Sequence, residues 1–179
     1  MTRNVRRTTV AFLALFLFSL TSALVAGPSS AATQRGGLNL AGYCESKGYT
    51  GLKLIDSTAY GWRCTTSSTT DSIHVIDACT WQYGPGQIDR MSDYFDPKSW
   101  TCWTASKQLG GVNLVGYCKS KGYNNAALVD STAYGWRCLS VKKTDSINMT
   151  DACKWQYKTT TAIDRMEKYT DPNSWKCWN

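Results

Sequence analysis

The chain has 179 residues, with 20 basic and 13 acidic side chains, one histidine, eight cysteines and eight tryptophans. Three basic residues and no acidic ones lie in residues 1–32, so the remainder carries a net charge of +4. Residues 36–103 carry −2 and residues 110–179 carry +4, and Arg35 and Lys107, which lie outside both segments, supply the other +2. These two segments repeat one another, as shown below, and a shared nucleic-acid function would need a basic face on both, so the charges argue against nucleic acid as a partner. The lysines of the second segment are more simply a solvated basic face.

The first 32 residues indicate an export signal. Three arginines precede an almost wholly apolar stretch, residues 10–26, and small residues follow up to Ala32. This order is typical of a secretory signal peptide, and we predict cleavage after Ala32. A retained membrane anchor is the alternative, but 17 apolar residues are at the short end for spanning a bilayer. We therefore expect a secreted, extracellular protein without a stable membrane anchor.

The rest of the chain consists of one sequence repeated twice. Residues 56–64 return unchanged as residues 130–138, and motifs on both sides recur at the same offset of 74 residues. A single inserted residue later changes the offset to 75. We predict two modules, residues 36–103 and 110–179, joined by a link over residues 104–109 that is too short to act as a free tether.

Each module carries four cysteines at matching positions. The spacing lacks a C-x-x-C pair and any repeated histidine, which argues against zinc, and we predict no metal site. A secreted module of about 70 residues buries too little apolar surface to be stable without cross-links, so we predict disulfides. Four cysteines allow three pairings. Because one cysteine of each half-module follows Trp-x and another lies in a helix-like stretch, we favour Cys44–Cys64 and Cys79–Cys102. The predicted disulfide cysteines are Cys44, Cys64, Cys79, Cys102, Cys118, Cys138, Cys153 and Cys177.

Short helices and strands alternate in the first half of each module. Asn39 can cap a helix that runs to Lys47, and Gly48 is placed to end it. Leu52 and residues 60–64 lie in strand-like pieces on either side of an Asp-Ser-Thr turn.

The second half of each module repeats this order. A helix is expected over residues 77–83 and, in the second copy, over residues 151–157 with Thr150 as its N-cap. An Asp-Pro turn at residue 96 and a strand over residues 99–103 follow. The predicted fold class is therefore α+β: two tandem small disulfide-stabilised modules, each with two short helices and a small antiparallel sheet.

Few residues are suited to catalysis. The only histidine, His74, is replaced by Asn148 in the other copy, and disulfides occupy the cysteines. The chain has no nucleophile elbow, zinc-protease motif or phosphate-binding glycine loop. The aspartates common to both copies are more simply helix caps, turns and ion-pair partners than an acid/base pair. We expect no enzyme, no catalytic residue and no cofactor.

Aromatic side chains are the positive signal for function, with four tryptophans and five tyrosines at matching positions of each module. Flat rings with a polar edge suit stacking on sugars or contact with a protein partner. Tryptophans also cover disulfides, which is the role expected for Trp81 and Trp155. The best candidate segment, residues 56–63, combines aromatic rings with a carboxylate and a guanidinium, and the tryptophan after the last cysteine comes second. The predicted ligand-binding residues are Asp56, Tyr60, Trp62, Arg63 and Trp103, with their twins Asp130, Tyr134, Trp136, Arg137 and Trp178.

The motif order N-L-x-G-Y-C, W-R-C, D-A-C-x-W-Q-Y and D-P-x-S-W-x-C-W resembles a tandem four-cysteine, Trp-rich secreted repeat of high-GC Gram-positive bacteria. The resemblance covers nearly all of the mature chain and implies no ligand or site residue. Because two weak sites gain avidity on a repetitive polymer, we expect a non-catalytic protein that binds an extracellular glycan or cell-wall polymer. The alternative is a secreted protein-binding module, such as a protease inhibitor or antagonistic factor, with a preorganised loop that contacts a secreted protein.

Overall fold

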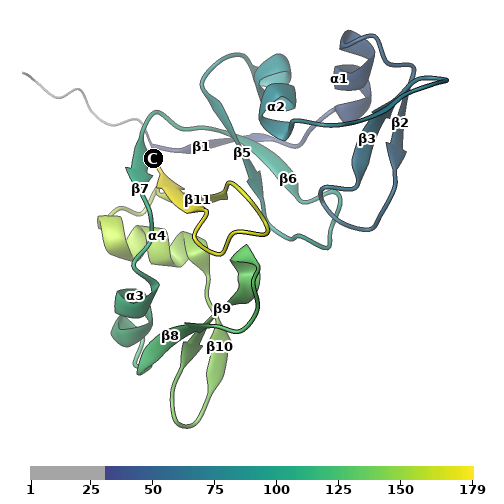
Figure 1. The fold of residues 1–179 in the computed structure, drawn as a ribbon. Coiled ribbons are helices and arrows are strands. Elements are labelled where there is room, and N and C mark those ends of the chain that lie inside the picture. Colours follow the sequence, from purple (N-terminus) through teal and green to yellow (C-terminus); the bar gives the residue numbers. More distant parts are fainter. Residues whose placement is uncertain (1–30) are drawn as a thin grey trace, which may run out of the picture.

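A computed structural model describes residues 31–179, so the predicted signal peptide over residues 1–32 lies almost entirely outside the described residues. We call residues 36–103 the first repeat and residues 110–179 the second repeat. Their elements follow nearly the same order (Figure 1). The elements up to residue 104 are β1 (Thr33–Gly36), α1 (Leu40–Ser46), β2 (Gly51–Leu54), β3 (Trp62–Thr65), β4 (Thr70–Ser72), α2 (Val75–Tyr83), β5 (Gln87–Met91) and β6 (Trp100–Thr104). The later elements are β7 (Gln108–Gly110), α3 (Leu114–Ser120), β8 (Asn125–Leu128), the 3₁₀ helix η1 (Ala133–Gly135), β9 (Trp136–Leu139), β10 (Thr144–Ser146), α4 (Met149–Tyr157), β11 (Ile163–Met166) and β12 (Trp175–Trp178).

The strands of the described chain form four antiparallel sheets of three strands each. The first repeat forms β2-β3-β4 and β1-β6-β5, and the second forms β8-β9-β10 and β7-β12-β11. The edge strands β1 and β7 come mostly from the residues just before each repeat. The predicted mixture of helices and strands is confirmed, but the expectation of a single small sheet per repeat is wrong. Each half of a repeat instead builds its own sheet against its own helix, because each helix is bonded to a different central strand.

Four disulfides join each helix to the central strand of one sheet. Cys44 of α1 bonds Cys64 of β3, and Cys79 of α2 bonds Cys102 of β6. The second repeat has the same pattern, so the favoured pairing is confirmed. All eight half-cystines are buried, and the described residues contain no free cysteine. This chemistry indicates an oxidising environment.

Of two predicted helix N-caps, one is confirmed and one is wrong. Helix α1 begins after Asn39, as predicted, because the Asn39 side chain accepts a first-turn N–H. The predicted N-cap Thr150 is wrong, since Asn148 caps α4 by accepting the N–H of Asp151 at 3.0 Å. The Thr150 hydroxyl, within the first turn, hydrogen-bonds the carboxylate of Asp164 instead.

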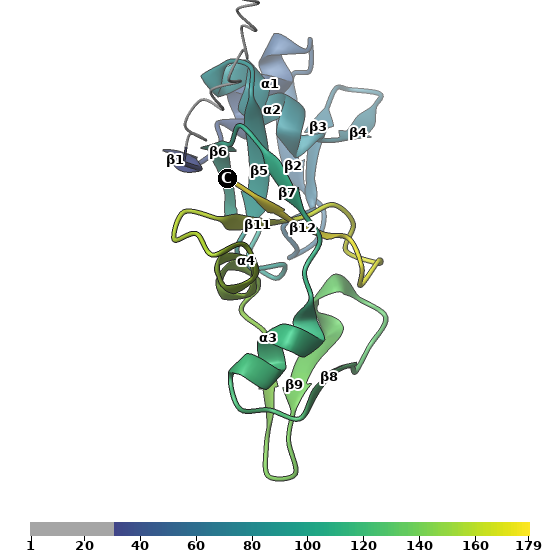
Figure 2. The ribbon, with the colours of Figure 1, turned by 90° about the vertical axis from the view of Figure 1, so that its left-hand side faces the viewer.

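The two repeats lie end to end and meet along β5 and β11 (Figure 2). Arg90 donates two hydrogen bonds to Asp164, at 3.1 and 2.9 Å, and Arg165 donates two to Asp89, at 2.9 and 2.7 Å. Arg165 and Asp164 occupy the positions of Arg90 and Asp89 in the repeat. The contact is therefore reciprocal, as in the interface of a two-fold dimer.

Apolar packing continues across this seam. Tyr94 and Tyr169, which are equivalent in the repeat, stack with ring centroids 3.7 Å apart. Ile88 and Ile163 pack together with Ala105 of the link. A larger cluster also joins buried residues of both repeats. Because they share this packing, the repeats form one body.

Candidate functional site

A cleft lies at the same place in each repeat, with a volume of about 410 Å³ in the first and about 390 Å³ in the second. Each is bounded by the segment that leads into the first helix, by two tryptophans and by the Asp-Pro turn. The two clefts can therefore be compared position by position.

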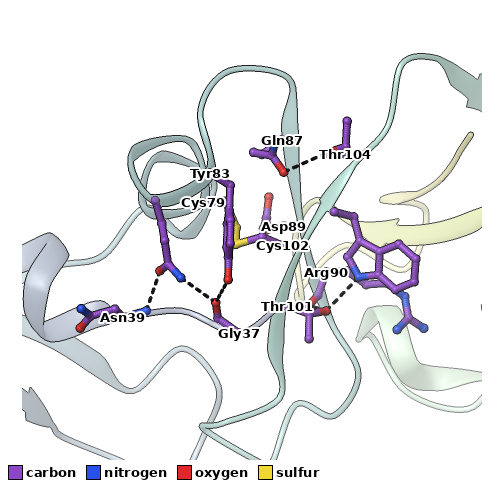
Figure 3. The surroundings of a disulfide bond; sticks show 12 residues. Gly37, Asn39, Cys79, Tyr83, Gln87, Asp89, Arg90, Thr101, Cys102 and Thr104 are labelled. Atoms are coloured by element: carbon purple, nitrogen blue, oxygen red, sulfur yellow. Dashed lines mark hydrogen bonds between the residues drawn. A yellow bond between two sulfur atoms is a disulfide. The ribbon is translucent and has the colours of Figure 1, made fainter. Parts of the chain in front are cut away.

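Helix α2 holds the first wall of the cleft in place. The side chain of Gln82 accepts the N–H of Asn39 at 2.7 Å and donates to the carbonyl of Gly37 at 3.2 Å. The Tyr83 hydroxyl donates to the same carbonyl at 2.8 Å (Figure 3). The second repeat has the same three bonds. The W-Q-Y motif thus positions the segment that forms one side of the cleft.

Two tryptophans from different sheets line each cleft. Trp62 of β3 donates from Nε1 to the carbonyl of Pro97 at 2.7 Å, which fixes the Asp-Pro turn as the opposite wall. Trp100 of β6 is only 5% exposed and donates from Nε1 to the carbonyl of Ala59 at 2.7 Å. Trp136 and Trp175 bond in the same way in the second repeat. Trp62 and Trp136 are partly exposed, so neither ring is closed off by packing.

The two clefts differ at a few positions on their rims. Lys98 of the first cleft corresponds to Asn173 of the second, and Ala41 corresponds to Val115. The first cleft therefore carries an ammonium where the second carries an amide. An apolar floor with a small number of polar rim groups is the usual design of a site for a small polar ring.

The structure divides the predicted segment, residues 56–63, and brings only Trp62 into the cleft. The Asp56 carboxylate accepts the N–H and the hydroxyl of Thr58, and these bonds lower the pKa of Asp56. Arg63 donates from Nη1 to the carbonyls of Tyr60 and Trp62. Both charged side chains shape the loop itself, and the twins Asp130 and Arg137 make the same contacts.

The two predicted tyrosines pack edge-on against the buried cleft tryptophans. Tyr60 lies 5.1 Å from Trp100 and Tyr134 lies 5.3 Å from Trp175, measured between ring centroids. Burial raises the pKa of Tyr60 to about 12 and also raises the pKa of Tyr134. Both hydroxyls therefore stay protonated near neutral pH.

Trp103 and Trp178 lie at the seam between the repeats, where they pack against Ile88 and Ile163. The Nε1 of Trp103 donates to the hydroxyl of Thr101 at 3.0 Å, whereas the Nε1 of Trp178 is buried without a hydrogen-bond partner. These two rings, placed among the site residues from the sequence, lie apart from the clefts. Both remain partly exposed.

Sequence reasoning missed Trp100, Trp175 and the turn at Pro97 as parts of the site. Only the pairing of helices, strands and disulfides brings the Asp-Pro turn beside Trp62, which lies 35 residues earlier. The expected core role of Trp81 is wrong as well, because its side chain is 43% exposed.

Other kinds of site find little support in residues 31–179. No group of three or more His, Cys, Asp or Glu side chains there is arranged to hold a metal ion. His74 is exposed and lies just before α2. None of the helices in this range combines the length and the apolar character needed to cross a membrane. Comparison with protein-family models, curated proteins and solved structures finds no match to this chain.

Proposed function

We propose that this is a secreted, non-catalytic binding protein whose repeats act as tandem modules on an extracellular glycan or cell-wall polymer. The observation that carries the proposal is the pair of equivalent clefts, each with an accessible indole beside a buried one. Indole faces stack on the C–H faces of sugar rings, and the rim groups supply directional hydrogen bonds.

The size of the clefts supports a small repeating unit as the ligand. Both volumes lie near the lower end of the range of roughly 300–1,000 Å³ that small-molecule sites occupy. Their lining contains tryptophan, leucine, proline and two polar residues, Asn39 and Lys98 in the first cleft and Asn113 and Asn173 in the second. A neutral or weakly charged sugar ring matches this chemistry better than a strongly charged group does.

The four disulfides support export, because they persist in an oxidising compartment. The predicted signal peptide is the route that we propose for this export, with the chain released after cleavage.

The seam between the repeats supports binding of one polymer by both clefts. Reciprocal ion pairs and the stacked tyrosines hold the repeats together, so the two clefts keep a fixed separation. Once one cleft is occupied, the second meets the same polymer at a high effective concentration, which increases overall affinity by roughly 10²–10⁴-fold.

The test is retention of the mature protein on insoluble chitin and on insoluble peptidoglycan. Ala41 and Val115 are exposed, equivalent positions on the rims of the first and second clefts. Ala41→Trp and Val115→Trp fill one cleft each without removing a structural contact. Each single variant should lose roughly 100-fold in apparent affinity, since avidity is lost with either cleft. The double variant should not be retained.

The matched control is Ser67→Trp, which adds the same ring to an exposed loop between β3 and β4, away from both clefts. It should be retained like the wild type. Retention of the double variant on every polymer that retains the wild type would contradict the proposal. If no glycan retains the wild type but a secreted protease does, the protein-binding alternative is the better account.

A further inference from the structure

A second aromatic surface, outside the clefts, differs between the repeats. Trp81 of α2 is 43% exposed, and Tyr43 of α1 lies edge-on to it with centroids 6.1 Å apart. The equivalent pair, Trp155 and Tyr117, has nearly the same geometry, with centroids 6.0 Å apart. Trp155, however, is only partly exposed, and the ammonium of Lys158 lies 5.2 Å from its ring centroid.

The cation that lies over the ring of Trp155 belongs to the residue that ends the helix. Lys158 follows α4, and Gly84 follows α2 at the corresponding position. Lys158 has a φ of 53°, and it is the one non-glycine residue with positive φ in residues 31–179. Residues with a Cβ disfavour this left-handed conformation. The second repeat therefore holds a cation over its indole in spite of the backbone cost, whereas Gly84 leaves the Trp81 ring open.

Two acidic residues lie on the helices that carry the open indole and its neighbouring tyrosine. Asp77 lies one helical turn before Trp81. Burial is the main cause that raises the pKa of Tyr43, and the negative charge of Asp77 raises this pKa further. Glu45 lies one turn beyond Gly42 on α1, and a Cβ at Gly42 would lie only 3.1 Å from Cη2 of Trp81. Both acidic positions are therefore on helix faces that border the Trp81 ring.

The same surface of the second repeat is basic. Lys119 stands where the first repeat has Glu45, and Lys154 stands where it has Thr80. Together with Lys158, these substitutions account for much of the charge difference between the repeats. One cation is common to both: Lys47 and Lys121 lie 5.6 and 5.4 Å from the centroids of their neighbouring tyrosines. The uncovered tryptophan and the carboxylate of Glu45 are thus specific to the first repeat, whereas Asp77 has an equivalent in the second, Asp151.

We infer that the surface formed by Tyr43, Glu45, Asp77 and Trp81 binds the protonated amine of an amino sugar in a polymer with free amines. The Lys158 ammonium on Trp155 shows, within the same chain, which chemical group this indole face accepts. Cation–π attraction and two carboxylates favour the amine, while the indole face stacks on the sugar ring. The choice of a glycan as the carrier of the amine rests on the proposed function; the preference for a cation rests on the Trp81 surface alone.

The experiment compares a soluble glucosamine oligomer with the same oligomer after acetylation of every amine, by calorimetric titration of the mature protein in mildly acidic buffer. The wild type should bind the amine form about tenfold more tightly. Trp81→Ala should remove this preference, and Glu45→Lys with Thr80→Lys, which introduces the equivalents of Lys119 and Lys154, should reverse it. Trp155→Ala is the matched control and should leave the preference unchanged.

Equal binding of the two oligomers by the wild type, or an unchanged preference in Trp81→Ala, would overturn the inference. A trilysine peptide that binds at Trp81 more tightly than the glucosamine oligomer would overturn the assignment to a glycan. The double variant Ala41→Trp, Val115→Trp separates the two proposals. If this variant loses binding to the acetylated oligomer, the clefts are supported as the glycan sites. If the wild type shows no preference for the amine form in the same experiment, the Trp81 site is rejected and the cleft proposal is unaffected.

Discussion

The two repeats share the contacts that hold their helices, sheets and clefts together. They differ in side chains at the seam between them and on the surface of the second helix of each repeat. The disulfide pairing is the same in both copies. So are the hydrogen bonds that hold the cleft walls and the loop at Asp56. The differences lie at the seam, where Thr150 replaces Ile76, and on the helix surface, where Lys158 replaces Gly84. One scaffold therefore tolerates different surfaces, and each difference can be tested against its twin.

The largest expected effect concerns the reciprocal ion pairs. Arg165→Ala takes from Asp89, whose side chain is 9% exposed, the guanidinium that pairs with it across the seam, and should lower the free energy of unfolding by about 3–5 kcal/mol. Arg90→Ala should cost less, because the Thr150 hydroxyl still bonds Asp164. Urea denaturation measures both. Lys53→Ala, on an exposed part of β2, is the control, and an Arg165→Ala loss no larger than the control would contradict this account.

The disulfides should behave alike in the two repeats. Cys79→Ala with Cys102→Ala opens a bridge of sequence separation 23, and Cys153→Ala with Cys177→Ala opens one of separation 24. Because the unfolded chain is restricted to a similar extent in each case, each pair should lower the free energy of unfolding by about 3 kcal/mol. Guanidinium denaturation tests this equality. A loss in one repeat only would show that the other is stabilised from elsewhere.

A smaller and opposite effect is expected at the equivalent tyrosines. The Tyr134 hydroxyl is buried without a hydrogen-bond partner, whereas Tyr60 is 37% exposed. Tyr134→Phe should therefore raise the free energy of unfolding by about 1 kcal/mol, since an unsatisfied buried group is removed. Tyr60→Phe should leave it nearly unchanged. Thermal denaturation of the two variants decides this, and a destabilised Tyr134→Phe would indicate that the hydroxyl has a partner.

The same tyrosines predict a modest loss of stability in alkali. Burial raises the pKa of Tyr60 to about 12, so the folded state keeps a proton that the unfolded state releases near its ordinary value of 10.0. This contribution is fully present below pH 10 and is lost as the pH rises toward about 12. Urea midpoints measured across this range should fall less steeply in Tyr60→Phe than in the wild type. Parallel curves would contradict the assigned shift.

Local signals predicted the local structure well. The Asn39 cap, the Asp-Pro turn and the link between each helix and its strand depend on residues close in sequence, and the structure confirms them. The prediction of Thr150 as an N-cap is wrong because Asn148, two residues earlier, also has a capping side chain and accepts the N–H of Asp151.

The site was only partly predictable for a different reason. Trp62 was identified from its chemistry, but its neighbours Pro97 and Trp100 come from a distant segment that only tertiary packing brings close. Trp81 is 43% exposed although it lies in a helix two residues after the buried Cys79, so the local sequence alone does not predict which side of this helix is covered.

The central claim is that the two clefts are the ligand sites, and NMR of the indole N–H groups tests it most directly. The Nε1 groups of Trp62 and Trp136 form part of the cleft walls, whereas those of Trp103 and Trp178 lie at the seam. On titration with a soluble chitin oligomer or a peptidoglycan fragment, the two cleft signals should shift together and the two seam signals should stay in place. Shifts confined to the seam signals, or no shift with a polymer that retains the protein, would contradict the account.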